Sequence, residues 1–309
     1  MDLRRWRQAK DIFIYKKSLS EILDLHALWL ESNQERGQQF ILGLEINKAI
    51  YQKAGIKETD STTFSIGPLV LKKANIGIDE ITEWSYFSGA DLRRVQLEGA
   101  DLRHATFSHA CLGGANLKNA NLNDTDFNYA NLRGANLEGA SLCRTTFRET
   151  DLYRANLRGA DQSGAESINA SFKGADLCDG KLANTRFTQA DLREAKLCRA
   201  ELRKASLRWA DLRDADLSEA DLSEADLRYA ILVGAKFGEA DFTRVKLGNT
   251  IFGYNDLRKV KHLETCIIKR ACSIDAHTLE TSQNLPTDFL RGCGMSNRFI
   301  DAIKNVNNR

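Results

Sequence analysis

The sequence predicts an all-β solenoid, a chain that winds into coils stacked along one axis. The first observation is a run of thirty-five consecutive pentads with centres from Phe87 to Leu257, most of which read Ala-Asp/Asn-Leu-x-x. Neither the 3.6-residue period of a helix nor the two-residue period of a strand fits five, so the chain must turn once in each pentad. The second observation is that no proline occurs between residues 69 and 285, as expected where backbone N–H groups bond to a neighbouring coil.

The third observation is the spacing of phenylalanines among pentad centres that are mostly leucine. Phenylalanine occupies the centres at Phe87, Phe107, Phe127, Phe147 and Phe187. These residues are twenty or forty apart, so they share one inner wall, an aromatic ladder, if four pentads make a coil. We therefore predict a quadrilateral parallel β-helix over residues 87–259, with about nine coils that rise roughly 4.8 Å each.

Each pentad is expected to point its centre and the small residue two positions earlier into the core, with three residues facing solvent. Two adjacent centres, Gln162 and Ser167, break this rule because they are polar. An unpaired buried polar group costs about 1–3 kcal/mol. We therefore favour a local bulge that turns Ile168 inward, or a hydrogen-bonded kink. The alternative is a weakened coil that bends the rod or admits a partner.

The ends of a solenoid expose unpaired strands and need covers. Residues 1–39 are predicted to form an N-terminal helical cap, with a helix over 18–32. Residues 40–86 continue the five-residue spacing weakly, which favours irregular solenoid coils, although a helix over 40–54 competes with this interpretation. Residues 260–309 are predicted to be a C-terminal capping or interaction segment. There Ser296 is a candidate N-cap for a helix with the apolar stripe Phe299, Ile300, Ile303 and Val306, which would seal the last coil or pair with a second copy in a homodimer.

Composition excludes several classes of function. The net charge is +2, and residues 86–259 hold 25 basic and 25 acidic side chains, so direct binding to nucleic acid is not expected. No apolar run is long enough to span a membrane. Seven cysteines without framework spacing favour a reducing cytoplasm and free thiols. Cys178 and Cys198 are the exception to note, because a twenty-residue coil stacks them closely enough to bridge under oxidation.

No motif of catalytic chemistry is present. The sequence contains no phosphate-binding glycine loop, no C-x-x-C and no H-E-x-x-H, and its five histidines are scattered. We expect a protein that is not an enzyme and that binds neither cofactor nor metal.

One surface cluster is a candidate interface with a protein partner. Arg208, Trp209, Arg228 and Tyr229 occupy equivalent outward positions on adjacent coils, and Tyr129 lies further along the same edge. Arginine, tryptophan and tyrosine are enriched at interface hot spots. The alternative is that these side chains only stack on one another and support the coil.

The repeat, as in "GADLRRVQLEGADLRHATF", closely resembles that of the bacterial pentapeptide-repeat proteins. The resemblance covers residues 87–257 strongly and 40–86 weakly, and it implies a right-handed quadrilateral β-helix. The C-terminal segment also resembles the one that precedes a Toll-receptor-type (TIR) signalling domain in certain pentapeptide-repeat proteins. The matching residues are Cys266, Ile274, Asp275, Thr278, Leu279, Pro286, Phe289, Leu290, Arg291, Gly292, Cys293, Gly294, Ile300 and Asp301. No TIR domain follows in this sequence.

Two functions remain after these steps. The first is a rigid, non-enzymatic scaffold or adaptor, in a bacterial signalling or defence assembly as the resemblance of the C-terminal segment implies. The second, which comes from the family resemblance, is modulation of a type II topoisomerase (gyrase) by DNA mimicry. Mimicry requires a strongly negative rod, and the balanced charge of residues 86–259 argues against it. Only the acidic stretch at 211–226 favours it.

Overall fold

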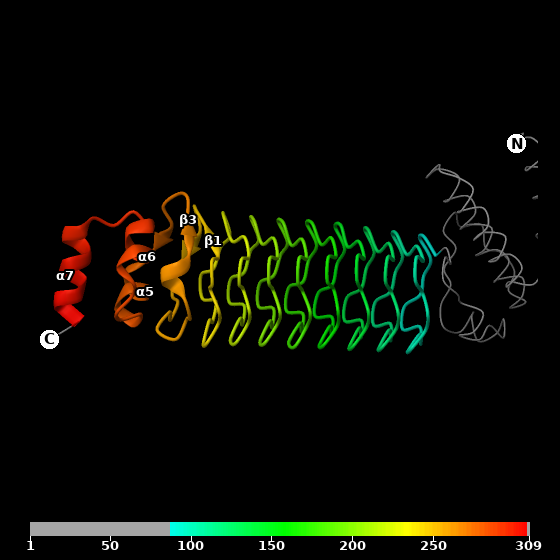
Figure 1. The fold of residues 1–309 in the computed structure, drawn as a ribbon. Helices are drawn as coiled ribbons and strands as arrows, with labels where there is room; N and C mark the ends of the chain where they lie inside the picture. Colours follow the sequence, from blue (N-terminus) through cyan, green and yellow to red (C-terminus); the bar gives the residue numbers. More distant parts are fainter. Residues whose placement is uncertain (1–86, 308–309) are drawn as a thin grey trace, which may run out of the picture.

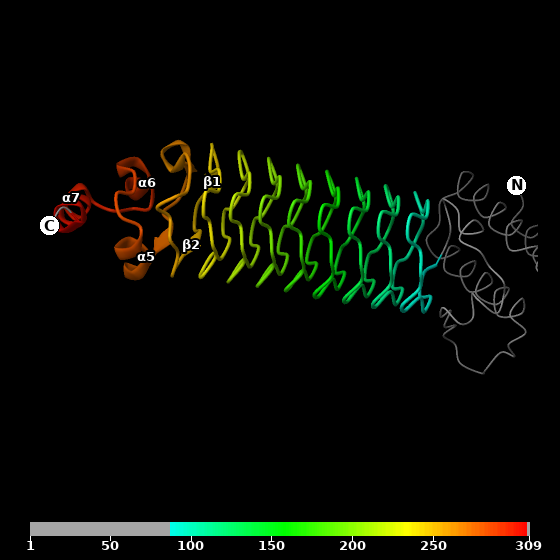
Figure 2. The same cartoon turned by 90° about the horizontal axis from the view of Figure 1, so that it is seen from below.

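The computed structural model describes residues 87–307, and side chains up to residue 303, so the predictions for residues 1–39 and 40–86 lie outside the described residues. The described chain forms a rod of stacked coils with helices at its C-terminal end (Figure 1). Parallel bridges join residues twenty apart, from Asp91↔Cys111 to Asp241↔Lys261. Four pentads therefore make one coil, and Figure 2 shows successive coils lying parallel along the rod.

The pentad repeat folds this way because each of its positions has a distinct role. Centre residues such as Leu92 and Leu102, and small residues such as Ala105, are at most 1% exposed. The N–H of a centre residue donates to a carbonyl in the next coil, as in Leu92 N to Cys111 O at 2.8 Å. Three residues after the centre, a second N–H closes a turn on the centre carbonyl, as in Ala105 N to Leu102 O at 3.1 Å. Coil contacts and turns thus satisfy most of the backbone, and side chains supply further bonds, as in Asn128 N to Asp126 Oδ1 at 2.8 Å.

The aromatic ladder is continuous over its first four residues. The rings of Phe87, Phe107, Phe127 and Phe147 stack in sequence with centroids 5.0–5.4 Å apart. At the next coil the wall carries Ser167 instead. There Phe172, a centre on the adjoining side of the same coil, makes edge contacts with Phe147 at 6.5 Å and with Phe187 at 5.4 Å. Phe237, Phe242 and Phe252 are also buried centres away from the ladder wall.

The predicted bulge at residues 162–167 is wrong. The bridges Asp161↔Lys181 and Glu166↔Arg186 keep the twenty-residue register, and Ile168 remains an outward, half-buried side chain. Gln162 and Ser167 point inward with 0% exposure. Within residues 87–307, neither the Gln162 amide nor the Ser167 hydroxyl has a hydrogen-bond partner. The backbone bonds of these two residues to the next coil are nevertheless kept, from Gln162 N to Lys181 O and from Ser167 N to Arg186 O, both at 2.8 Å.

The solenoid continues past the predicted boundary at residue 259. Strand β1 (Lys246–Leu247) pairs with β3 (Ile267–Ile268), and β2 (Ile251–Phe252) pairs with β4 (Ser273–Ile274). The spacing between partners grows from the regular twenty to twenty-one and then twenty-two residues. The short 3₁₀ helix η2 (Leu263–Thr265) precedes β3, at the point where this lengthening begins.

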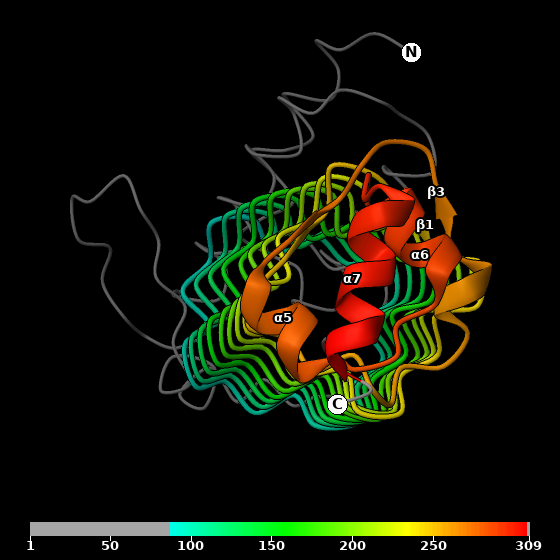
Figure 3. The same cartoon turned by 90° about the vertical axis from the view of Figure 1, so that its left-hand side faces the viewer.

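Three helices follow the last coil: α5 (Ala276–Thr281), α6 (Thr287–Gly292) and α7 (Asn297–Asn307). Seen along the rod, α5 and α6 lie over the end of the coils (Figure 3), and α7 lies beyond them (Figure 1). Asp275 caps α5 by accepting a hydrogen bond from the Thr278 N–H at 2.8 Å. From α6, Phe289 packs edge-on against Phe252 with centroids 5.9 Å apart. Gly292 allows α6 to approach closely, because a Cβ there would meet the side chain of Ile268.

Helix α7 begins as predicted, with the Ser296 hydroxyl accepting a hydrogen bond from the Phe299 N–H at 3.3 Å. Its predicted apolar stripe is divided. Ile300 is 1% exposed and Ile303 half-buried, whereas Phe299 is 51% exposed, and the Val306 side chain lies outside the described ones. No helix in the described part of the chain is both long and apolar enough to cross a lipid bilayer.

Candidate interaction surface

The candidate surface is built on one corner of the coil. Two residues after each centre the backbone is left-handed, and this turn position holds glycine in many pentads, for example Gly89 with φ +70°. Trp209 and Tyr229 occupy the same position with φ values of 62° and 66°. For a residue with a side chain this conformation costs roughly 1–2 kcal/mol. The turn also points both rings away from the core.

The two rings form a tight stack. Their centroids are 4.1 Å apart and their planes are inclined by 7°. Trp209 remains 54% exposed and Tyr229 is half-buried. The structure thus brings these two predicted residues together on neighbouring coils, linked also by the Trp209 N–H to Arg228 carbonyl hydrogen bond of 3.2 Å.

The two predicted arginines differ in their surroundings. Arg228 is held by Asp226, through Nε to Oδ1 at 2.8 Å and Nη2 to Oδ2 at 2.6 Å. Burial alone would raise the pKa of Asp226, but hydrogen bonds from the side chain and backbone of Arg228 hold that pKa below its usual value. Arg208 acts on the same carboxylate only by longer-range attraction and forms no ion pair with a described residue. Of the two arginines, Arg208 is therefore the one whose charge is available to a partner.

Tyr129 lies on the same corner but far from the Trp209 stack. It is 50% exposed and stacks on His109, with centroids 4.8 Å apart and planes inclined by 5°. The sequence analysis counted His109 only among the scattered histidines and missed this pair. The sequence does indicate the pair, because His109 and Tyr129 are twenty residues apart at equivalent turn positions. One corner of the rod thus carries two separate aromatic stacks.

Sequence reasoning also missed the apolar neighbours of the Trp209 stack. Ile231 and Ile251 follow the corner, on the outward column that holds Asp191 and Asp211 in the preceding coils. Ile231 is half-buried and Ile251 is 40% exposed. The signal in the sequence was the loss of the usual Asp before two successive centres of one side.

Three carboxylates of the acidic stretch at 211–226, those of Asp211, Glu224 and Asp226, form ion pairs within the rod. Asp211 binds Arg213 through Nε at 2.9 Å and lies 3.7 Å from Arg193 Nε. Glu224 pairs with Arg203 at 3.1 Å and with Lys204, twenty residues earlier, at 3.8 Å.

Other basic residues also pair with a carboxylate of the preceding coil. Lys196 lies 3.9 Å from Asp176, and Arg199 binds Asp179 at 2.7 Å. Within the Asp-Leu-Arg repeats, the carboxylate also accepts the N–H of the arginine two residues later, as in Asp211 and Arg213 at 3.2 Å. The recurring aspartates are thus turn-forming residues.

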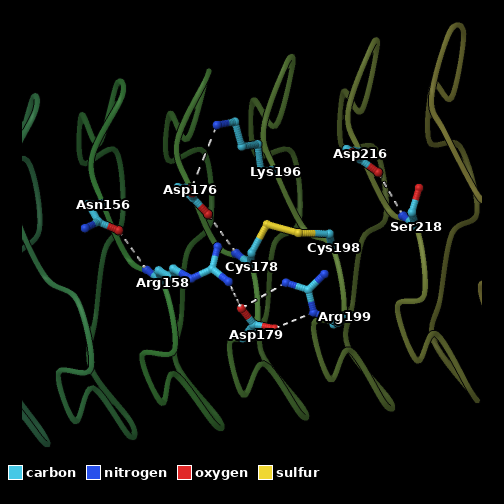
Figure 4. The surroundings of a disulfide bond; sticks show 10 residues. All are labelled: Asn156, Arg158, Asp176, Cys178, Asp179, Lys196, Cys198, Arg199, Asp216 and Ser218. Carbon is cyan, nitrogen blue, oxygen red and sulfur yellow. Dashed lines mark hydrogen bonds and ion pairs between the residues drawn. A yellow bond between two sulfur atoms is a disulfide. The ribbon is translucent and has the colours of Figure 1, made fainter.

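The expectation of free thiols is wrong for one pair of cysteines. Cys178 and Cys198 form a disulfide between adjacent coils, with Cα atoms 4.7 Å apart. Cys178 is only 2% exposed, so its side of the bond is shielded from solvent. Figure 4 shows it beside Asp179, which is bound by Arg158 and by Arg199. The register of twenty forces the two side chains together.

The other five cysteines are free. Burial raises the pKa of the Cys266 thiol to about 12, so this thiol is unreactive at neutral pH. Across residues 87–307, no group of three or more histidine, cysteine, aspartate or glutamate side chains could hold a metal ion.

Known proteins share this repeat. The family model for pentapeptide repeats matches in eight copies, over residues 85–124, 125–164, 170–208, 181–219, 205–244 and 220–252. A search of curated proteins finds no match.

Among solved structures, HetL from the cyanobacterium Nostoc sp. strain PCC 7120, described as involved in heterocyst differentiation regulation, is 30% identical. That match covers 62% of this chain and 87% of HetL, with a TM-score of 0.40. A trypsin-treated form of QnrB1, a plasmid-mediated fluoroquinolone resistance protein, is 20% identical over 70% of this chain and 98% of its own, with a TM-score of 0.47. The family model, which matches more than half of the chain, establishes that the chain belongs to the pentapeptide-repeat family, and the twenty-residue coil agrees with it.

Proposed function

We propose that this protein is a non-enzymatic scaffold or adaptor that binds a protein partner through the corner carrying Trp209 and Tyr229. The observation that carries the proposal is the exposed Trp209–Tyr229 stack at a left-handed turn position. Stacking fixes both rings before any partner arrives, so little side-chain entropy remains to be lost on binding. A 54% exposed tryptophan on an otherwise charged rod is the kind of side chain that anchors an interface.

The rod supports the scaffold role because it holds its outward side chains in fixed rows. We infer a right-handed quadrilateral coil whose C-terminal end is closed by α5 and α6. We also place the protein in a bacterial signalling or defence assembly in the cytoplasm. The five free cysteines favour that compartment, and the buried position of Cys178 limits the access of reductants to the one disulfide.

The experiment is site-specific photo-crosslinking in the native cell. A photoreactive phenylalanine analogue at position 209 should yield a reproducible protein adduct. The same analogue at position 219, an exposed turn residue on another corner of the same coil, should not. Equal adducts at both positions, or none at position 209, would refute the proposed surface.

The C-terminal segment supports a second contact, between two copies of the chain. Phe299 on α7 is 51% exposed, although its neighbour Ile300 is buried. We propose that Phe299 contributes to a homodimer. The molar mass from light scattering should then fall from dimer to monomer for Phe299→Asp and stay unchanged for Phe299→Leu. A wild-type monomer at all accessible concentrations would refute the dimer.

DNA mimicry remains the second candidate, because QnrB1, a fluoroquinolone resistance protein, is among the structural matches. Asp211, Glu224 and Asp226 are already engaged in ion pairs, and the equal numbers of basic and acidic residues over 86–259 argue against the strongly negative surface that a DNA-binding groove would recognise. A gyrase supercoiling assay distinguishes the two functions. We expect no change on addition of this protein, and inhibition that disappears when Asp214 and Asp216 are replaced by asparagine would favour mimicry.

A further inference from the structure

Two outward isoleucines follow the corner that carries the Trp209–Tyr229 stack. Ile231 lies two residues after Tyr229, on the other side of buried Ala230, and Ile251 is its bridge partner in the next coil. We call Trp209, Tyr229, Ile231 and Ile251 the apolar corner. An outward position that holds aspartate in two preceding coils and isoleucine in the next two has changed from polar to apolar at one end of the rod.

The exposure of these side chains is unusual for this rod. Among the described residues only five large apolar side chains are strongly exposed: Tyr129, Trp209, Ile251, Tyr254 and Phe299. Two of the five, Trp209 and Ile251, belong to the apolar corner. Covering such side chains with a partner removes apolar area from water, which is favourable. Contiguous exposed apolar groups of this kind mark contact sites.

Basic side chains lie beside the apolar corner, on the side of each coil that comes before the corner in the sequence. We call them its basic border. Arg208, Arg228 and Lys246 lie there, with Asp226 as the shared carboxylate. Asp226 is bound by Arg228 and is the bridge partner of Lys246. Neither Arg208 nor Lys246 forms an ion pair with any residue that the structure describes. Three cations against one carboxylate leave this border with a net positive charge.

We propose that the apolar corner and its basic border bind an acidic amphipathic segment of another protein. This inference rests on the proposed function and specifies the chemistry of its partner. Apolar side chains of the segment contact Trp209 and Ile251, and its carboxylates pair with Arg208 and Lys246. The two isoleucines favour a protein over a single-stranded nucleic acid, because nucleic-acid platforms combine aromatic rings with a longer basic groove.

The test begins with a library of random short peptides displayed on phage and selected on the immobilised full-length protein. Enriched peptides should carry net negative charge together with leucine, isoleucine or aromatic residues. Synthetic versions, labelled for fluorescence anisotropy, then give a Kd that weakens as salt rises, because exposed ion pairs are screened.

Variants separate the apolar and the electrostatic contributions. Ile251→Asp and Trp209→Ala should each raise the Kd about tenfold or more. Arg208→Glu should weaken the binding of acidic peptides and strengthen the binding of peptides in which lysine replaces the acidic residues. Glu219→Arg, on another corner of the same coil, and Tyr129→Ala, on the distant stack, are the matched controls and should bind normally. Ile251→Thr keeps a β-branched side chain and serves as a milder variant in case Ile251→Asp does not fold. Thermal melts check the folding of every variant.

Several outcomes would overturn the inference. One is enrichment of neutral or basic peptides, or no enrichment at all. Another is a Kd for acidic peptides that is unchanged by Arg208→Glu. A third is tighter binding of an oligothymidylate probe than of any peptide. Crosslinks at position 209 to a partner without an acidic segment would refute this inference and leave the scaffold function standing. Absence of any partner at position 209 would remove both.

Discussion

Phe172 occupies the interior beside Ser167, on the same coil, and thereby closes the gap that the serine leaves in the aromatic ladder. Its ring makes edge contacts with Phe147 below and with Phe187 above. The serine hydroxyl is buried without a partner among the described residues. A small residue on the ladder wall and a large one on the adjoining side thus compensate for each other in volume.

This relationship predicts strong coupling between the two positions. Ser167→Phe alone should destabilise the protein by about 1–3 kcal/mol through overpacking. Phe172→Leu alone should cost about 1–3 kcal/mol because it leaves a cavity. The double variant restores the pattern of the other coils and should recover most of the loss in a double-mutant cycle measured by denaturant unfolding. Simple additivity of the two losses would contradict the compensation.

Gln162 should be a site where an apolar residue stabilises the fold. Its amide is buried without a hydrogen-bond partner in the described residues, between Leu142 and Leu182 in the neighbouring coils. Gln162→Leu should raise the free energy of unfolding by about 1–3 kcal/mol. The exposed Gln189→Leu serves as the control and should change it by less than about 0.5 kcal/mol. A loss of stability in Gln162→Leu would show that the amide is satisfied in solution.

The Cys178–Cys198 disulfide should contribute measurably to stability, because it closes a loop of twenty residues. Replacing both cysteines by serine should lower the free energy of unfolding by about 3 kcal/mol in the absence of reductant. Cys143→Ser, which alters a free thiol, should have a much smaller effect. Thiol titration of the unfolded chain provides an independent check, with five thiols before reduction and seven after it. Seven thiols before reduction would contradict the bond.

Acid should destabilise the rod through its aspartate–arginine pairs. Hydrogen bonds from Arg144, Arg199 and Arg258 lower the pKa values of Asp124, Asp179 and Asp256, respectively. A lowered folded-state pKa means that the contribution is present above the unfolded value of about 3.9 and is lost as the pH falls through the folded value. Thermal melts should therefore show Tm decreasing below about pH 4.

A single substitution checks the origin of that acid sensitivity. Asp179→Asn removes a carboxylate shared by Arg158 and Arg199. The variant should be less stable than the wild type at neutral pH, and the difference should shrink as the pH falls. A constant difference at every pH would assign the effect to packing instead of charge.

The sequence alone determined the coil, because the repeat acts through spacing. Phenylalanines twenty residues apart indicated four pentads per coil, and the bridges confirm that register from Asp91 to Lys261. The same twenty-residue spacing predicted that Trp209 and Tyr229 lie on neighbouring coils, where their rings stack. Stacked coils place equal positions above one another, so a surface neighbour can be counted along the chain.

Other features depend on several coils at once, and only the tertiary structure decided them. They are the filling of the core, the direction of individual side chains and the bonds between coils. The ring of Phe172 fills the place beside Ser167, and Gln162 stays inward without a bulge. Cys178 and Cys198 are bonded, and strand pairing continues to Ile274 with two extra residues. A periodic sequence specifies which residues meet, but the core volume and the closure of backbone hydrogen bonds determine how each side chain is accommodated, and both are properties of the assembled stack.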